Sequence, residues 1–487
     1  MPGRILLLAN GQATDAAAAP RLPSADFQQV LADAVTAGAR VSAFFGQAEA
    51  DGAVRISAVL ANDRQGSLGL LSTVARGSLP SLAAECPALE RFERVLLEEH
   101  GLVPAGHPWP RPVRLGGEAA PLFAMAGGEV HEVAVGPVHA GIIEPGHFRF
   151  QCHGEHVFHL EIALGYQHRG VARLLAAGPD RRTAVLAESI AGDTAVGHAL
   201  ASARAQEGLA GVEAPPRGAV LRGVALELER IANHVGDLGA LAGDVGFLPT
   251  ASFCGALRAD YLNALAELCG NRFGRGLVVP GGVRFDLPAD AAGRLADRLA
   301  ATFERVEAAA GLFFTSPSVR NRTDGTGVLT RQAAATLGMV GPSARASGLR
   351  VDVRSTHPFA PYTTDSVPVV TSPAGDVYAR SWVRLEEARN SARLVDRWLR
   401  DLPPGPVRVA VAALGPGRLV VSLVEGWRGE LCHAVTTGPG GGFATYDVVD
   451  ASFHDWKGLE LAMRGGQISD FPLCNKSFNL SYAGHDL

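Results

Sequence analysis

The sequence predicts an α+β fold, in which a small N-terminal α/β domain precedes a larger, mainly helical domain with small peripheral β-sheets. Three observations predict it. Residues 26–115 mix helical spacing with strand-like alternation, and residues 220–401 contain long stretches with apolar side chains at helical spacing. From Val407 to Val449 apolar and polar residues alternate again, which is typical of strands.

The length and composition agree with a large globular protein. At 487 residues the chain favours two or three domains, and 47% hydrophobic residues provide enough material for a large core. The 44 basic and 49 acidic side chains leave a net charge of −5, which gives no electrostatic basis for binding nucleic acid. No apolar run reaches the roughly 18–20 residues of a membrane span, and Ile5–Ala9 is too short for a signal-peptide core. We therefore expect a cytoplasmic protein that contacts a membrane only through partners.

The cysteines exclude one class of site. Six cysteines are scattered without any Cys-x-x-Cys pair, at Cys86, Cys152, Cys254, Cys269, Cys432 and Cys474. Because iron–sulfur clusters and nickel centres need clustered thiolates, we expect this chain alone to bind no such group. The Gly-rich turn Gly438–Gly442 contains neither Gly-x-Gly-x-x-Gly nor a P-loop lysine, so nucleotide binding has no support within the chain.

The first part of the chain is predicted to be a lead-in followed by the small domain. Residues 1–24 are interpreted as a loose lead-in and residues 25–115 as the α/β domain. Its expected elements are a helix, two strands and a second helix, at residues 27–37, 41–45, 54–60 and 92–102. Gly101 should end the second helix as its C-terminal cap. A linker is predicted over residues 116–129.

Residues 130–487 form the larger predicted domain. A Gly/Pro loop enters a hairpin that turns at Gly154-Glu155, and Glu188–His198 is interpreted as the first turns of a long helix. Further helices are expected at residues 220–242, 256–268, 289–311 and 379–401. Between the last two, Arg345–Asp352 is predicted to be an irregular polar stretch.

Several motifs carry a resemblance to a known family. Glu188–His198 and Lys476–Gly484 together resemble the two metal-binding ends of a nickel–iron hydrogenase large subunit. Further matching segments follow in order, at residues 136–150, 227–234, 345–348, 375–380, 427–430 and 452–456. Residues 130–487 are thus similar to energy-converting, membrane-bound hydrogenases and to the 49 kDa-type subunit of respiratory complex I. The helix before Gly106-His107-Pro108 resembles the end of the 30 kDa-type complex I subunit, which implies a fused form of the two.

The resemblance breaks at the metal ligands. In the family each end carries a Cys-x-x-Cys pair, whereas the four positions here are Ala191, Thr194, Ser481 and Gly484. Alanine and glycine offer no donor atom, and hydroxyl groups are hard, poorly acidic ligands. We therefore expect no nickel–iron centre and no hydrogen chemistry.

The resemblance implies roles for residues around this site. Glu144 occupies the position of the hydrogenase proton-relay glutamate, with a capping carboxylate as the alternative. Asp193 and Thr194 would replace the site chemistry and line the cavity. His234 matches a family histidine whose protonation tracks cluster reduction, although a lone helical histidine is often only a satisfied polar residue. His198 is expected to serve packing or an internal hydrogen bond.

Other positions concern an electron acceptor and a partner. The complex I branch binds a quinone headgroup between a tyrosine and a histidine; those positions fall near Ala191 and near Pro145, where His147 could substitute. His168 and Arg169 are expected to face the acceptor or a partner's iron–sulfur cluster, or else to form an ordinary interface salt bridge.

The function implied is that of an oxidoreductase subunit. The expected partners are a small subunit with an iron–sulfur cluster and antiporter-like membrane subunits, in a complex on the inner face of the cell membrane. The complex I relation adds an association with quinone and with NAD. A first hypothesis has electrons passing from the partner's cluster to a quinone-like acceptor or driving ion movement; the alternative is a redox-silent structural or coupling subunit. A soluble hydrolase is disfavoured, because the sequence has neither Gly-x-Ser-x-Gly nor His-Glu-x-x-His.

Overall fold

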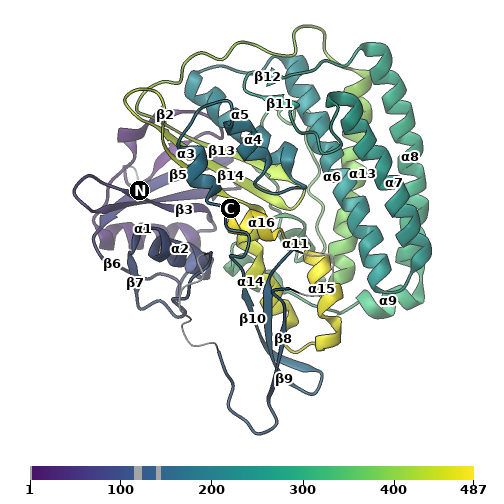
Figure 1. The fold of residues 1–487 in the computed structure, drawn as a ribbon, viewed down its shortest axis with the longest axis horizontal. Helices are drawn as coiled ribbons and strands as arrows, with labels where there is room; N and C mark the ends of the chain where they lie inside the picture. The colour runs from purple at the N-terminus through teal and green to yellow at the C-terminus, as the bar shows by residue number, and fades with distance from the viewer. Residues whose placement is uncertain (1–2, 115–122, 139–143) are drawn as a thin grey trace.

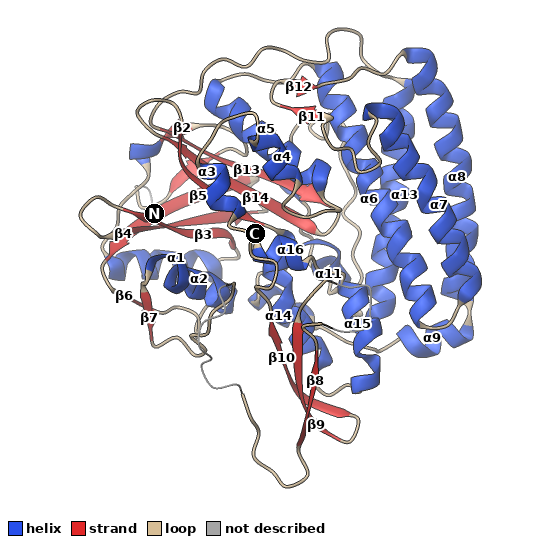
Figure 2. Ribbon diagram, in the orientation of Figure 1, coloured by secondary structure: helices blue, strands red, loops and turns tan. Residues whose placement is uncertain are grey.

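A computed structural model describes residues 3–114, 123–138 and 144–487. Long helices gather on one side of the molecule, and most strands lie on the other side among shorter helices (Figures 1 and 2). The predicted α+β class is confirmed. Of the predicted linker at 116–129, residues 116–122 lie outside the described residues.

The N-terminal part is a four-stranded antiparallel sheet with two helices. The strand order is β1-β5-β4-β3, with bounds Leu6–Leu8, Ser67–Ala75, Val54–Asn62 and Arg40–Ala48. The helices are α1 (Ser24–Thr36) and α2 (Glu90–His100), and Gly101 ends α2 in the left-handed conformation at φ 64° as predicted. The short parallel strands β6 and β7 lie at Ser78–Pro80 and Val103–Ala105.

The first residues are not a loose lead-in, which corrects the sequence interpretation. Strand β1 pairs with β5 of the N-terminal sheet, and β2 (Thr14–Asp15) pairs with β13 (Arg418–Gly426) of the C-terminal sheet. Each strand edge leaves backbone N–H and C=O groups that need partners, and these short strands satisfy some of them.

A three-stranded sheet and a series of helices follow. The sheet contains β8, β9 and β10, with bounds His131–Val135, His147–His153 and His156–Ala163, so the predicted hairpin is confirmed. The next helices are α3, α4 and α5, at Val171–Ala176, Thr183–Glu188 and Ala195–Ala210. The expected helix start at Glu188 is wrong, because residues 189–194 form a loop before α5.

Four long helices pack side by side. They are α6, α7, α8 and α13, with bounds Pro216–Asp244, Leu248–Cys269, Ala289–Thr315 and Val377–Arg400 (Figure 1). The first three contain the predicted helices, and α13 matches the helix predicted at residues 379–401 except that it ends one residue earlier. The small hairpin β11–β12 spans Val278–Val279 and Gly282–Val283. Short helices α9 to α12 occupy Pro317–Thr323, Arg331–Thr336, Gly341–Ala346 and Val353–Thr356.

The C-terminal part builds the second large sheet. Strands β14 (Gly429–Thr437) and β15 (Phe443–Val449) extend β13, giving the order β15-β14-β13-β2. Helices α14, α15 and α16 end the chain at Ala451–Met463, Phe471–Phe478 and Tyr482–Asp486.

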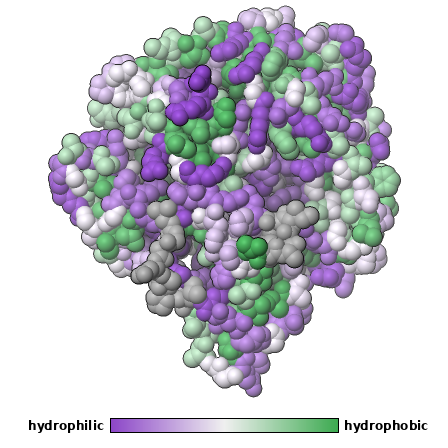
Figure 3. Space-filling view, in the orientation of Figure 1, coloured by the Kyte–Doolittle hydropathy of each residue, from purple (hydrophilic) through white to green (hydrophobic). Residues whose placement is uncertain are grey.

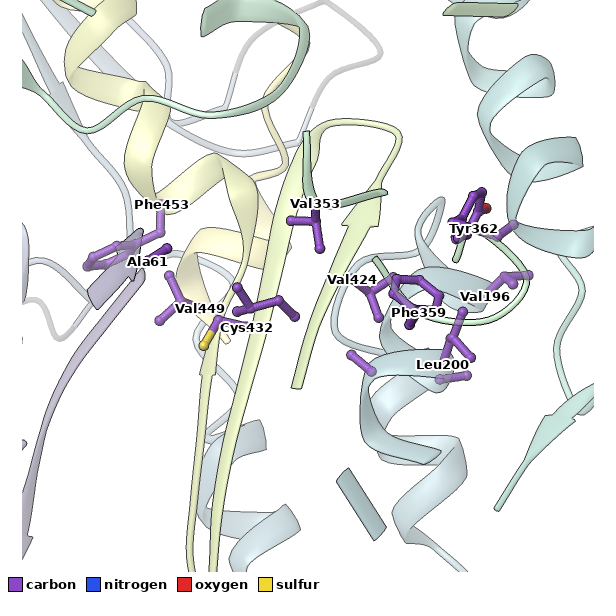
Figure 4. Close-up of a cluster of buried hydrophobic side chains, with 14 of the residues drawn as sticks. Ala61, Val196, Leu200, Val353, Phe359, Tyr362, Val424, Cys432, Val449 and Phe453 are labelled. Atoms are coloured by element: carbon purple, nitrogen blue, oxygen red, sulfur yellow. The ribbon is translucent and has the colours of Figure 1, made fainter. Parts of the chain in front are cut away.

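The largest hydrophobic core crosses the predicted boundary between the two domains. Figure 4 shows Ala61 of β4 near Cys432 of β14, Val449 at the end of β15 and Phe453 of α14. The same buried cluster continues through α5 into the long helices. The N-terminal sheet and the rest of the chain are therefore packed on one continuous core.

The surface in Figure 3 is mainly hydrophilic, with smaller hydrophobic areas between the polar side chains. Within the three described ranges, no helix is both long and apolar enough to cross a membrane.

Candidate functional site

Arg428 joins the two stretches that carry the degenerate ligand positions. It lies in the tight turn between β13 and β14. Its Nη2 atom donates to Asp193 Oδ2 at 2.7 Å, and Nη1 donates to Thr194 Oγ1 at 3.3 Å. Its Nε atom donates to the backbone oxygen of Asn479. The loop 189–194 and the C-terminal segment therefore meet at one guanidinium group.

The loop is fixed from several elements. The backbone oxygen of Asp193 accepts hydrogen bonds from Trp427 Nε1 at 2.9 Å and from Asn233 Nδ2 at 3.0 Å. The Asp193 side chain is 35% exposed, whereas that of Arg428 is 5% exposed. Although burial alone would lower the Arg428 pKa, the Asp193 carboxylate raises it. The pair thus places a fixed positive charge at the site and a carboxylate that solvent can reach.

The residues at the four degenerate ligand positions either are small or have a side-chain oxygen that already takes part in a hydrogen bond. Ala191 is fully buried, and Ser481 Oγ accepts a hydrogen bond from Gly484 N at 2.9 Å, which caps α16. A Cβ atom on Gly484 would lie 2.6 Å from Asp450 Cγ. In the described part of the chain, no group of three or more His, Cys, Asp or Glu side chains could hold a metal ion.

Glu144 lies at the same site. One of its carboxylate oxygens accepts a hydrogen bond from Tyr482 N at 2.9 Å, so the entry loop contacts the C-terminal segment directly. Burial raises the pKa of Glu144, while the Tyr482 N–H and the Arg428 charge only partly oppose this. A carboxyl group with a raised pKa keeps its proton to a higher pH than a solvent-exposed one, which suits it to proton transfer.

Glu229 is a second proton-binding candidate, which the sequence analysis quoted only within a motif. From α6 it accepts hydrogen bonds from the first N–H groups of α5, Val196 N at 2.7 Å and Gly197 N at 3.1 Å. Burial raises its pKa to about 8 despite these donors, and the negative charge of Asp193 adds to the effect. Glu229 therefore caps the N-terminal end of α5, and with its raised pKa it can hold a proton near the loop 189–194.

A buried hydrogen-bonded relay begins beside Gly484. His198 Nε2 lies 3.0 Å from Asp450 Oδ2, and its Nδ1 lies 3.1 Å from His433 Nε2. His433 Nδ1 lies 2.9 Å from Tyr446 Oη, which is 2.9 Å from Ser202 Oγ. The predicted internal hydrogen bond of His198 is confirmed, and Asp450 and His433 were missed because their partners are distant in sequence.

His234 belongs to a different environment. It lies in a cluster of buried, oppositely charged side chains, here called the α6 charge network, made of Glu227, Arg230, Arg345, Asp352, Arg354, Glu387 and Glu425. Its Nε2 atom lies 3.0 Å from Glu387 Oε2. Burial lowers its pKa to about 4, and the Glu387 carboxylate only partly opposes this. His234 is therefore neutral at pH 7, and the structure does not bring it into contact with Glu144, Asp193 or Thr194.

The three predicted acceptor-binding residues hold the entry segments in place. Arg169 donates to the backbone oxygens of Ser189 at 2.6 Å and Ile190 at 2.9 Å, so it binds the site loop. His168 Nδ1 lies 2.8 Å from Asp486 O, and His147 Nδ1 lies 3.1 Å from Gly136 O. In the described residues these contacts are to backbone oxygens, and both expected roles of His168 and Arg169, toward a partner's cluster or in an interface salt bridge, stay predictions.

An entry hairpin, a bundle of long helices and two ligand-type stretches joined at one arginine define a large subunit of the hydrogenase and complex I type. The family model described as respiratory-chain NADH dehydrogenase, 49 Kd subunit, matches residues 244–417. The chain is 31% identical to the carbon monoxide-induced hydrogenase of Rhodospirillum rubrum, over 72% of this chain and 97% of that protein. It is 28% identical to formate hydrogenlyase subunit 5 of Escherichia coli, over 84% of this chain and 76% of that protein. It is 32% identical to NADH-quinone oxidoreductase subunit 4 of Thermus thermophilus, over 58% of this chain and 68% of that protein. The chain therefore belongs to the family that unites these hydrogenase and NADH dehydrogenase subunits, and it is an oxidoreductase subunit by descent.

Proposed function

We propose that this chain is the large subunit of a membrane-associated oxidoreductase complex in which proton-binding side chains have replaced the nickel–iron centre. The observation that carries the proposal is the packing of Asp450 against Gly484. A side chain at position 484 would collide with the Asp450 carboxylate, so the fourth ligand position has no room for a thiolate in this arrangement.

The residues at the other positions do not fit a nickel–iron centre either. Ala191 has no donor atom, Thr194 Oγ1 accepts from Arg428, and Ser481 Oγ caps α16. Nickel and iron of this kind need thiolates, which none of these residues supplies. We therefore assign no hydrogen-forming step to the protein.

The proton-binding groups support a reaction that consumes protons. A quinone-like acceptor takes up two electrons and two protons to become a quinol. Glu144 and Glu229 are carboxyl groups with raised pKa values, and both lie near enough to Asp193 for its negative charge to contribute to the increase. In this proposal they deliver protons, while the electrons come from an iron–sulfur cluster of a partner small subunit near Arg169 and His168.

The partners and the location follow from the relatives. One relative, 28% identical over 70% of this chain, is the membrane-bound hydrogenase subunit alpha of Pyrococcus furiosus. We propose that this chain likewise contacts the membrane through partners, which include antiporter-like subunits, on the inner face of the cell membrane.

A second candidate is a redox-silent coupling subunit. The relay from Asp450 through His198 and His433 to Tyr446 supports it, because this chain of hydrogen bonds can shift protons without any electron transfer. The Arg428–Asp193 ion pair is also complete without a ligand.

The test is to purify the protein gently from its native membranes, identify its partners by mass spectrometry and quantify iron and nickel in the same sample. Iron with antiporter-like subunits and no nickel is expected from the first proposal. The same partners without iron would remove electron transfer and leave the coupling role. Stoichiometric nickel would overturn the interpretation of Ala191, Thr194, Ser481 and Gly484.

A further inference from the structure

The turn that carries Arg428 is held by buried ion pairs on both of its strands. Residues 427–428 connect β13 to β14, and Glu425 of β13 lies directly opposite Glu430 of β14 in the register. Both glutamate side chains are buried. Because carboxylates that face each other on adjacent strands repel, each of them needs a cation of its own.

The two cations come from different parts of the molecule. Arg345 of the α6 charge network lies 2.7 Å from Glu425, between Nη1 and Oε1. Arg40, the first residue of β3 in the N-terminal sheet, donates from Nη2 to Glu430 Oε2 at 2.8 Å. Strand β3 lies against β14 (Figure 1). The N-terminal part therefore contacts the site turn only two residues after Arg428.

Arg40 is itself anchored within the N-terminal sheet. Its Nε and Nη2 atoms donate to the two carboxylate oxygens of Asp63, which follows β4, at 2.7 and 2.9 Å. Although burial would raise the pKa of Glu430, the Arg40 charge holds it at about 2, so Glu430 is ionised. Burial lowers the pKa of the neighbouring His454 to about 4, so this neutral ring cannot take the place of Arg40 as the countercharge.

The start of β14 has little space in which to move. A Cβ atom on Gly429 would lie 2.8 Å from Gly341 Cα of α11, so the two backbones are in close contact. Arg428, the preceding residue, contacts Asp193 and the backbone of Asn479. In such close packing a displacement of Glu430 is passed on to Arg428, because no void is present to absorb it.

We propose that Arg40 is a positioning residue, which through Glu430 keeps Arg428 in place beside Asp193. The N-terminal part then sets the geometry of the site and is more than a neighbouring domain. This inference rests on the proposed function only where it assigns proton binding to Glu144. Since the Arg428 charge lowers the Glu144 pKa and the Asp193 charge raises it, a displaced Arg428 should raise that pKa.

Two measurements on the complex isolated from native membranes would test this. Hydrogen–deuterium exchange reports on the loop 189–194, and an infrared pH titration follows the carboxyl band that Glu144→Gln removes. Glu430→Leu is the main variant, because Arg40 stays paired with Asp63 and no charge is left buried alone. We expect exchange in the loop to become at least about threefold faster. The Glu144 pKa should rise by about half a unit or more, whereas the mere loss of a nearby carboxylate would lower it.

Three further variants separate positioning from folding. Arg40→Gln should act in the same direction as Glu430→Leu and replaces it if that variant fails to fold, while Arg40→Lys, which retains the charge, should restore most of the native behaviour. Asp63→Asn weakens the contact within the N-terminal sheet and keeps Glu430 paired, so it should leave both measurements unchanged.

Native exchange and a native Glu144 titration in Glu430→Leu would reject the proposal. An equal effect of Asp63→Asn would reject it as well, because Arg40 would then act through the stability of its own sheet. A complex without iron would remove the proposed electron transfer and leave both measurements intact, so the two failures can be told apart.

Discussion

The site around Arg428 and the α6 charge network contain the same kinds of side chain and differ in how they hold protons. In the network three of the four carboxyl groups have lowered pKa values: Glu227, Asp352 and Glu387. At the site Glu144 and Glu229 have raised pKa values. Direct ion pairing explains the difference, because Glu227, Asp352 and Glu387 each contact a guanidinium group, whereas Arg428 at the site pairs with Asp193, and Glu144 and Glu229 accept hydrogen bonds from backbone N–H groups.

The exception within the network follows the same rule. Four carboxyl groups share three guanidinium groups, so one carboxyl group must remain without a full countercharge. Burial and the nearby Asp352 carboxylate raise the pKa of Glu425 to about 7, despite its contact with Arg345 at 2.7 Å. The comparison indicates that arginine-rich clusters fix the fold, whereas carboxyl groups in excess bind protons.

The largest expected effect comes from breaking the network. Arg345→Met removes the guanidinium that contacts Glu387 Oε1 at 2.6 Å and Glu425 Oε1 at 2.7 Å. Leaving those carboxylates buried without their partner should cost about 3–5 kcal/mol of stability. Thermal unfolding would measure this, with Arg298→Met, whose partner Glu267 is exposed, costing less than about 1 kcal/mol. Equal unfolding temperatures for the two variants would contradict a structural role of the network.

A pair of substitutions on α6 sharpens the contrast, because Glu227 and Glu229 lie two residues apart. Arg354 and Arg230 outweigh the effect of burial and hold the Glu227 pKa at about 2, below its value in the unfolded chain. The ionised Glu227 therefore stabilises the fold at neutral pH, and this contribution is lost as the pH falls towards 2. The folded pKa of Glu229 is about 8, so its stabilisation is present at acidic pH and is lost as the pH rises through 8.

Glu227→Gln should therefore be less stable than the native protein at pH 7. For Glu229→Gln, the free energy of unfolding should rise relative to that of the native protein as the pH increases from 5 to 8.5, by an amount on the order of a few kcal/mol. Unfolding temperatures at pH 5, 7 and 8.5 would measure both. If Glu229→Gln followed the same pH trend as Glu227→Gln, the site would behave as a second structural network.

A smaller effect is expected at the fourth ligand position. Gly484→Ala places a methyl group against Asp450 and should cost about 1–3 kcal/mol through overpacking. Gly311→Ala in α8 is the matched control, since a Cβ atom there meets open space, and it should be neutral or stabilising. Chemical unfolding of both variants tests directly whether Asp450 leaves room for a side chain at position 484. A Gly484→Ala protein as stable as the native protein would show that the position has room for a side chain.

The sequence predicts the long helices well because their apolar stripes repeat over many turns, as in α6 from Val220 to Leu238. The start of α5 is missed for a physical reason. Its first N–H groups are capped by Glu229 from a neighbouring helix, and such a tertiary cap leaves no mark in the local sequence.

The candidate site is predicted in part. The loop at Asp193 and Thr194 and the segment at Ser481 were found through their motifs, and Glu144 does contact that segment. Arg345–Asp352 was interpreted as an irregular polar stretch, and residues 347–352 are irregular, but the buried charges that the stretch contributes to the network were not predicted. Such pairing spans 80 residues for Arg345 and Glu425 and 127 residues for Arg354 and Glu227, and composition alone cannot reveal it.

The pairing of β2 with β13 has a consequence for synthesis. Arg418 Nη2 donates to Ala13 O, and these two residues are separated by 405 positions along the chain. As the ribosome releases the chain from its N-terminus, residues 13–15 emerge long before their partner strand exists. At about 5–20 residues per second this interval lasts tens of seconds, during which the segment has to stay unpaired or be shielded by a chaperone.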